Sequence, residues 1–175
     1  MPELPEVETI VRALSRELAG RVCLSAEVLT PSIVEGSASQ LVRSLTGRRL
    51  KGVHRHGKTI IATFETPDGP AVLLHVHLGM TGQLLFEKGT ESPARHTHVR
   101  FVFEGHPREL RYRDIRRFGW LELASAGKSA LGPDAWLSEP EAVFAALREQ
   151  GGMAKAVLMN QAVLAGLGNI YVDES

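Results

Sequence analysis

Residues 49–65, RLKGVHRHGKTIIATFE, begin a region where the hydrophobic period of the chain is two, as in a strand. Turn signals such as Pro67-Asp68-Gly69 and Glu104-Gly105 divide this region into short segments. The strand candidates are Arg49–His56, Thr59–Glu65, Ala71–Leu78, Gln83–Phe86, His98–Phe103, Arg108–Arg113 and Trp120–Leu123. Many short strands at hairpin-like spacing predict an antiparallel sandwich or barrel, not a parallel sheet with crossover helices.

Helical patterns flank the strand region. Before it, apolar residues recur at helical spacing from Val7 to Leu18, and Gly20 supplies a stop. Arg21–Leu29 reads as a further strand, and Ser37 with Gln40 is a capping-box signature for a second helix. After Gly132-Pro133 the pattern is helical again, over Glu139–Glu149, Met153–Met159 and Ile170–Ser175. The sequence therefore predicts two parts, residues 1–132 and 133–175.

Composition describes an ordinary globular protein, with 43% hydrophobic and 23% charged residues. Twenty basic and twenty acidic residues cancel, so the net charge does not indicate a polyanionic partner. Between Arg95 and Arg117, however, seven arginines and three histidines face only three acids. Such a stripe suits phosphate neutralisation, but taken alone it is better explained as a solvated face of mixed charge.

Cys23 is the only cysteine, so neither a disulfide framework nor a thiolate zinc cluster can form within these residues. We expect Cys23, in an apolar run, simply to pack. There is no signal-peptide pattern, and no apolar run is long enough to cross a bilayer. The expected location is the reducing cytoplasm, without membrane association.

The first six residues, Met1-Pro2-Glu3-Leu4-Pro5-Glu6, carry the clearest chemistry. Removal of Met1 leaves a secondary amine at Pro2, whose pKa near 8 provides some uncharged nucleophile at neutral pH. Such an amine attacks an aldehyde carbon to form an iminium, and Glu3 and Glu6 are suitable partners for moving protons. The simpler interpretation is that Pro5 opens a helix whose positive end the acids complement. Both interpretations can hold.

Four further places stand out. Lys58 precedes the apolar Thr59-Ile60-Ile61 and could be a site residue or an edge charge that guards a sheet. Met80 lies on a loop bracketed by glycines, which favours a projecting tip over core filling. Residues 114–119, DIRRFG, place an aromatic between cations, as in loops that insert into a base stack. Residues 166–169, GLGN, weakly resemble a backbone phosphate cradle.

Together these features suit an enzyme that extrudes a DNA base and plugs the gap. The chain resembles the formamidopyrimidine-DNA glycosylase family, bifunctional bacterial enzymes that excise oxidised purines. The matching stretches are residues 1–9 (MPELPEVET), 77–82 (HLGMTG), 116–119 (RRFG) and 166–171 (GLGNIY), in family order. Leu4 favours the purine-excising branch, because the related endonuclease VIII branch usually carries Gly there.

The resemblance implies roles for four residues at the reacting sugar. Pro2 would attack C1′ of the damaged nucleotide, displace the base and leave an iminium. Glu3 would protonate the ring oxygen and shuttle protons through β- and δ-elimination, and Glu6 would organise water near the nucleophile. Lys58 would reach a phosphate beside the lesion.

The resemblance also implies the DNA-binding residues. Met80, Arg116 and Phe118 match the trio that fills the vacated helix, with Arg116 pairing to the orphaned cytosine. Asn169 matches a phosphate-binding asparagine and Lys155 a lysine near the flipped nucleotide. His77 is the remaining DNA-binding residue. The expected partner is damaged double-stranded DNA, bound by a monomer.

The implied fold is a mixed α and β structure: an antiparallel two-sheet β-sandwich with an N-terminal helix, followed by the start of a helix–two-turn–helix domain. The family's single structural zinc, in a four-cysteine finger, would lie beyond Ser175, so no metal or cofactor is expected within this chain. The chain ends in a helical turn with no cap. We therefore expect a truncated product, weakly active or inactive by itself, of a bacterial, nucleoid-associated parent enzyme.

Three other functions are compatible with parts of this pattern. The first is an endonuclease VIII-like enzyme for oxidised pyrimidines. The second is a non-catalytic binder that senses distorted DNA with its wedge loop, although Pro2, Glu3 and Lys58 together disfavour it. The third is a β-sandwich that binds a small ligand. Exact lesion preference cannot be read from these residues.

Overall fold

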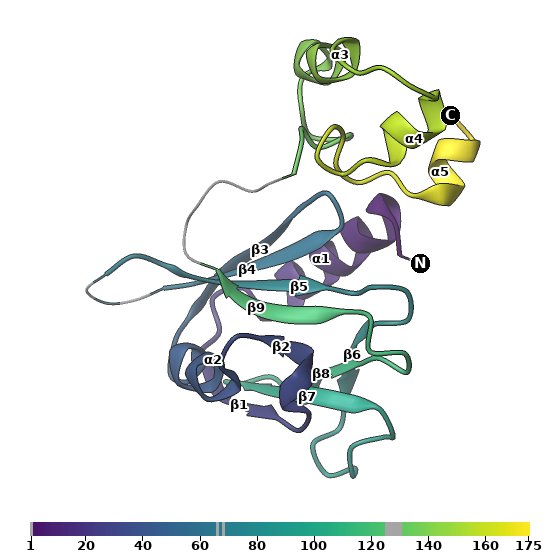
Figure 1. Cartoon of the computed structure of the whole chain (residues 1–175). Coiled ribbons are helices and arrows are strands. Elements are labelled where there is room, and N and C mark those ends of the chain that lie inside the picture. Colours follow the sequence, from purple (N-terminus) through teal and green to yellow (C-terminus); the bar gives the residue numbers. More distant parts are fainter. Residues whose placement is uncertain (1, 66, 68, 125–130) are drawn as a thin grey trace.

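Figure 1 shows the computed structural model of the chain, which describes residues 2–65, 67, 69–124 and 131–175. Met1, and Asp68 of the predicted turn at 67–69, lie outside these residues. Within them, the strands are β1 (Cys23–Val28), β2 (Val34–Glu35), β3 (Leu50–His56), β4 (Thr59–Phe64), β5 (Val72–His77), β6 (Gln83–Glu87), β7 (Thr97–Phe103), β8 (Glu109–Arg113) and β9 (Trp120–Ala124). The strands predicted from the alternating pattern are all present.

The strands form two sheets, with orders β1-β7-β8-β6 and β2-β9-β5-β4-β3. Among the strands of these two sheets, as far as the structure describes them, all pairings are antiparallel except that of the two-residue β2, which pairs in parallel with β9. The prediction of an antiparallel two-sheet sandwich is confirmed, with β2 as the exception. A strand of two residues has no measurable alternation, which explains why the sequence did not predict it.

Helix α1 (Leu4–Leu18) forms as its sequence predicts. Pro5 lies in its first turn, and Glu3 and Glu6 close a capping box around its start. Its buried residues form one apolar stripe, namely Leu4, Val7, Val11, Leu14 and Leu18. This stripe packs against β3 and β4, so the N-terminal end of the chain is held beside the β3–β4 hairpin.

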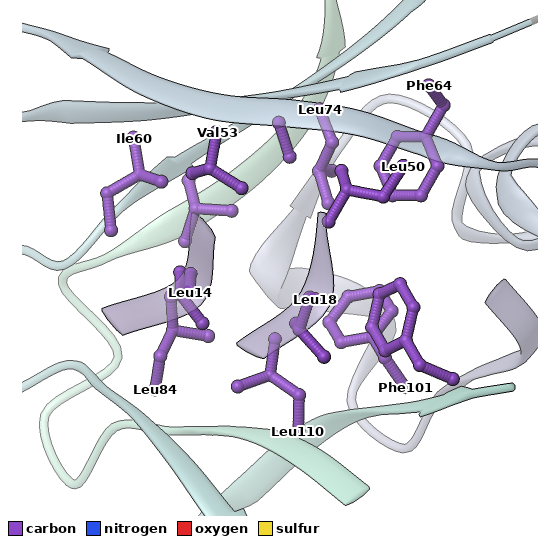
Figure 2. A pocket seen from close by; sticks show the side chains of 13 residues that line it. Leu14, Leu18, Leu50, Val53, Ile60, Phe64, Leu74, Leu84, Phe101 and Leu110 are labelled. Carbon is purple, nitrogen blue, oxygen red and sulfur yellow. The ribbon is translucent and has the colours of Figure 1, made fainter. Parts of the chain in front are cut away.

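The core lies between the two sheets. Figure 2 shows Ile60, Phe64 and Leu74 of one sheet pointing toward Leu84, Phe101 and Leu110 of the other, with Leu14 and Leu18 of α1 between them. Only about 30 Å³ of empty space remains there, and every residue around it is apolar. This space is a packing defect of the core and does not suit a polar ligand.

The remaining elements are η1 (Pro31–Ile33), α2 (Ala38–Leu45), α3 (Pro140–Arg148), α4 (Ala154–Met159) and α5 (Asn169–Asp173). Ser37 caps α2 by accepting a hydrogen bond from the Gln40 N–H, as predicted. Figure 1 shows α4 and α5 near the N-terminal end of α1 and the β3–β4 hairpin. The C-terminal segment therefore meets the sandwich at the end where the predicted nucleophile lies.

Candidate active site

The N-terminus is clamped onto the start of α5. The carboxylate of Glu3 is buried and accepts hydrogen bonds from the N–H groups of Gly168 (2.9 Å), Ile170 (2.9 Å) and Tyr171 (3.2 Å). The N–H of Leu4 donates to the carbonyl of Gly166 at 3.2 Å. These bonds join residues more than 160 positions apart, so the site depends on the tertiary fold.

The turn at 166–169 needs its glycines because the N-terminal residues pack closely against it. A Cβ atom at Gly168 would lie 2.5 Å from Cδ of Glu3, and one at Gly166 would lie 2.6 Å from Cδ1 of Leu4. Gly168 also gives its N–H to Glu3. The reading of this turn as a phosphate cradle is therefore replaced, because its glycines admit the N-terminal residues.

Lys58 lies in the tight β3–β4 turn and points at the same place. Its Nζ donates to the carbonyl of Leu167 at 3.0 Å, next to the residue that binds Glu3. Burial lowers the pKa of Lys58, while the negative charge of Glu3 opposes this shift. The turn thus brings a partly desolvated amine beside a buried carboxylate and the half-buried Pro2.

Glu6 and Tyr171 complete this cluster. The N–H of Glu3 donates to Oε2 of Glu6 at 2.9 Å, and the hydroxyl of Tyr171 donates to Oε1 at 3.3 Å. The pKa of Tyr171 is raised by desolvation and by the charges of Glu6 and Glu3. The sequence analysis gave Tyr171 no role, although it closes the 166–171 stretch.

The two predicted wedge segments lie side by side. Met80 is 43% exposed and Phe118 is 53% exposed, so both project instead of filling the core. A Cβ atom at Gly79 would lie 2.5 Å from the carbonyl carbon of Phe118, which shows how closely the two loops approach. The guanidinium of Arg116 lies over the Phe118 ring, 4.5 Å from its centroid. The structure therefore brings the predicted trio together on one surface.

Asp114 organises these loops from beneath. It is buried and accepts hydrogen bonds from Thr81 Oγ1 (2.5 Å), the Arg116 N–H (3.1 Å) and the Gly119 N–H (2.9 Å). Burial acts to raise the pKa of Asp114, but these bonds outweigh it and hold the pKa below its usual value. The sequence analysis quoted Asp114 only as the start of the wedge loop.

We expect Asp114→Asn to destabilise the protein by roughly 1–3 kcal/mol, because an amide NH₂ then faces a buried N–H donor. The depressed pKa means that the carboxylate stabilises the fold above its ordinary pKa, and that this contribution is lost as pH falls. Urea unfolding across the acidic range measures both effects. The exposed Glu91→Gln is the control. Equal stability of the two variants would contradict this role.

His77 lies between the Glu3–Lys58 cluster and the loops that carry Met80 and Phe118. Its Nδ1 accepts a hydrogen bond from the Gly79 N–H at 3.1 Å, and its ring stacks on Trp120 with centroids 5.5 Å apart. Burial lowers the pKa of His77, and the charge of Lys58 adds to the shift. His77 therefore lies between Lys58 and the Met80 loop.

Lys155 and Asn169 lie on exposed positions of the C-terminal segment. Nζ of Lys155 forms an ion pair with Oδ1 of Asp173 at 2.6 Å, and Nδ2 of Asn169 donates to Oδ2 at 3.3 Å. Both predicted DNA contacts thus share one carboxylate. They are near each other but are not part of the Glu3–Lys58 cluster.

A buried ion-pair network joins the sandwich to the C-terminal segment. Arg55 on β3 contacts Glu8 of α1 (2.7 Å) and Asp134 (2.5 Å). Asp134 also accepts hydrogen bonds from the N–H groups of Gly57 (2.7 Å) and Trp136 (2.9 Å). The sequence analysis missed this network, although a charged residue at the inward-facing position 55 was a signal.

The basic stripe at 95–117 is largely a structural network. Arg111 is buried and pairs with Glu87 (2.8 Å) and Glu109 (3.0 Å). Arg100 pairs with Glu109 and with Glu27 across the sheet. The mixed-charge interpretation therefore applies to these two arginines, whereas Arg116 belongs to the wedge surface.

Two features of the described residues bear on other functions. In that part of the chain, no three His, Cys, Asp or Glu side chains are grouped as metal ligands. No helix among the same residues is long and apolar enough to cross a membrane. Cys23 is buried, and burial raises its pKa to about 11, so its thiol packs as expected.

Known proteins match both the sequence and the structure. The formamidopyrimidine-DNA glycosylase N-terminal domain model matches residues 1–121. Formamidopyrimidine-DNA glycosylases of Synechococcus sp. and Geobacter metallireducens are 38% and 39% identical, each over 100% of this chain and 66% of the relative. The chain thus spans about two thirds of the length of these relatives.

Solved structures give the same result. The Lactococcus lactis Fpg in complex with DNA containing an abasic site has a TM-score of 0.86 and 33% identity. The same protein with DNA containing N7-benzyl-Fapy-dG has a TM-score of 0.86 and 34% identity. Each comparison covers 99% of this chain and 65% of the other.

Proposed function

Because the chain belongs to the formamidopyrimidine-DNA glycosylase family, we propose that the protein is a base excision repair DNA glycosylase. It removes oxidised purines such as 8-oxoguanine and formamidopyrimidines, and it then cleaves the abasic strand as a lyase. Its substrate is damaged double-stranded DNA, which it binds as a monomer. We place its action in the bacterial cytoplasm at the nucleoid.

One observation carries this proposal. Glu3, just before α1, and Lys58, in the β3–β4 turn, lie far apart in the sequence and bind the adjacent residues Gly168 and Leu167. The residue before Glu3 is Pro2, so a potential amine nucleophile, a carboxylate and a cation share one small region. A purely structural N-terminus does not need a buried carboxylate and a desolvated lysine together.

The reaction begins when the free nitrogen of Pro2 attacks C1′ of the damaged nucleotide. The glycosidic bond breaks, the base leaves with its electron pair, and protonation of the ring oxygen opens the sugar to give an iminium. The iminium accepts electrons as the C2′ proton leaves, and the 3′ phosphate is eliminated. Loss of the C4′ proton from the conjugated iminium then eliminates the 5′ phosphate. Water finally hydrolyses the iminium and restores the amine.

Glu3 supplies the proton for the ring oxygen in this scheme, and Glu6 orders water near Pro2. Because Glu3 accepts three backbone hydrogen bonds, it must release at least one of them to reach the sugar. Lys58 neutralises a phosphate beside the lesion, which its departure from Leu167 would permit.

DNA is held by the other predicted residues. Met80, Arg116 and Phe118 fill the space that the extruded nucleotide leaves, and Arg116 pairs with the orphaned cytosine. The guanidinium of Arg116 lies over the Phe118 ring, so Arg116 must leave this ring in order to pair with the cytosine. The other DNA contacts are assigned to His77, Lys155 and Asn169.

No metal takes part in this chemistry, and we propose no cofactor for residues 1–175. The zinc finger that the family resemblance implies needs four cysteines, whereas this chain has Cys23 alone. Cys23 is buried in the core of the sandwich. The residues present therefore do not fit the family's zinc site, which we assign to sequence beyond Ser175.

Borohydride reduction tests the proposal directly. We expect it to lock the full-length parent protein covalently to a duplex with an abasic site, in proportion to the iminium formed, with little or no adduct for residues 1–175 alone. Absence of an adduct, together with retained binding, would favour the non-catalytic binder of distorted DNA. A paired assay of base release from 8-oxoguanine and oxidised-pyrimidine duplexes distinguishes the endonuclease VIII-like alternative.

A further inference from the structure

Two rows of residues cross the outer face of the five-stranded sheet. The first row runs through the cross-strand partners His54, Ile61, His75 and Glu122, with Glu35 beside Glu122 on β2. The second runs through His56, Thr59, His77 and Trp120. The alternate positions Ile60, Leu74 and Val76 are buried in the core, so both rows face outward.

This face carries an unusual share of the titratable groups. Four of the chain's seven histidines lie on it, and Lys58 follows His56 in the hairpin turn. His56 Nε2 is hydrogen-bonded to the Gly132 carbonyl at 2.9 Å, and His77 is bonded to Gly79. Within the described residues, the side chains of His54 and His75 have no hydrogen bond or ion pair. Of the four histidines on this face, these two are therefore available to bind a ligand.

His54 and His75 gain charge in the acidic range, because the pKa of each lies below the ordinary histidine value. Burial lowers the pKa of His54, and neighbouring His56 adds to this shift. Burial also lowers the pKa of His75; Glu122 opposes the shift and His54 adds to it. The other charged groups facing the rows are Lys58 and Glu35 at their two ends. The β3–β5 side thus becomes more positive as pH falls, and the β9–β2 side remains acidic.

We propose that this outer sheet face is a phosphate-binding surface for duplex DNA, with His54 and His75 as its pH-dependent cations. The proposal rests on the proposed function, because Lys58 and His77 lie at the end of the surface nearest the N-terminus. His54 and His75 are two strands apart, so their backbones are separated by about 10 Å. Phosphates occur every ~3.4 Å of helix axis along one DNA strand, so one strand can reach both.

Binding of an undamaged, fluorescently labelled duplex tests the surface without requiring catalysis. Anisotropy titrations over a salt series are made at about pH 5.5 and about pH 8, the range over which histidine charge changes. For the wild type, we expect the slope of log K against log salt to steepen at acidic pH. The change should reach about 0.9 for each histidine that gains a phosphate contact.

Two double variants bracket this expectation. His54→Gln with His75→Gln should lose up to about 1.8 of the acid-induced change in slope, because both charges are absent. His54→Lys with His75→Lys should keep a steep slope at both pH values. His106→Gln is the control, because His106 packs against Phe86 on the other sheet and should leave the wild-type change intact.

The proposed phosphate-binding surface is overturned if the double variant His54→Gln with His75→Gln keeps the wild-type pH response. It is also overturned if the wild type does not bind the duplex at acidic pH. Borohydride trapping of the full-length parent protein on abasic DNA is measured in parallel at the higher pH, where His54 and His75 are neutral. Failed trapping with an intact pH-dependent slope rejects the proposed glycosylase and retains the surface. Normal trapping without a histidine-dependent change in slope rejects the phosphate-binding surface and retains the proposed glycosylase.

Discussion

Borohydride trapping on abasic DNA should fail completely when the nitrogen of Pro2 is acylated. Retention of Met1 turns this nitrogen into an amide, whose electron pair is delocalised into the carbonyl group and cannot attack C1′. Pro2→Glu provides this block without the proline, because methionine aminopeptidase does not remove Met1 before Glu and the nitrogen of residue 2 then stays in a peptide bond. Mass spectrometry of the same sample establishes which N-terminus is present.

Pro2→Gly separates loss of the amine from loss of proline. Glycine leaves a free primary amine after Met1 is removed, so we expect a weaker adduct instead of none. The wild-type rate should rise about tenfold per pH unit below pH ~8, because the deprotonated fraction of an α-amine rises in this way. Single-turnover trapping over this range measures the dependence.

Lys58 is the alternative nucleophile, because burial lowers its pKa and it lies beside Glu3. We expect Lys58→Met to keep the covalent adduct while weakening DNA binding, since its proposed partner is a phosphate. A Pro2→Glu protein that still forms the adduct, with loss of the adduct in Lys58→Met, would assign the attack to Lys58. The two single variants therefore identify the amine that reacts.

Every strand except β2 could be predicted from the sequence, because each spans five or more residues bounded by turn signals. β3 and β4 are an example: Ile60 and Phe64 face the core and Ile61 faces outward. The partner of each strand was much harder to predict. β1 pairs with β7, and β2 with β9, across long stretches of chain that no local pattern connects.

For the candidate site too, the residue types could be predicted from the sequence but their contacts could not. The reactive residue types were evident in the sequence, as Pro2 with Glu3 illustrates. Their contacts were not, because Glu3 binds Gly168 through a fold that closes over 165 residues. The sequence did not predict that Asp114 and Asp134 each bind several groups. Many of their partners are backbone N–H groups, which give no signal because nearly every residue has one.

Asp134→Ala should destabilise the protein by about 3–5 kcal/mol, the usual loss when one member of a buried ion pair is removed. The side chains of Arg55 and Asp134 are only 1% and 5% exposed. Nη2 of Arg55 already has no hydrogen-bond partner among the described residues, so the guanidinium has little to replace Asp134. Urea unfolding of the two proteins measures the loss.

The stability difference should also depend on pH. Burial acts to raise the pKa of Asp134, but N–H donors from Trp136, Gly57 and Leu137 and the charge of Arg55 hold it below its usual value. The carboxylate therefore stabilises the fold above the ordinary pKa of an aspartate, and this contribution disappears as pH falls through the folded value. Asp134→Ala should show a flatter acid limb than the wild type.

Asp173→Ala provides a matched control. Its ion pair with Lys155 has almost the same length, 2.6 Å against 2.5 Å, but the two side chains are 50% and 49% exposed. Solvent screens an exposed pair, so we expect a loss of about 0–1 kcal/mol. Equal losses in Asp134→Ala and Asp173→Ala would mean that burial does not govern these pairs.

A double-mutant cycle with Arg55→Met isolates the ion pair itself. Arg55→Met leaves Asp134 bonded to its N–H donors, so it should cost less than Asp134→Ala. The double variant should be more stable than the sum of the single losses predicts, because methionine needs no partner for a charge. Losses that add within about 0.5 kcal/mol would show that Arg55 and Asp134 are not coupled. In that case Asp134 would help to attach the C-terminal segment to the β3–β4 hairpin through its backbone hydrogen bonds and not through Arg55.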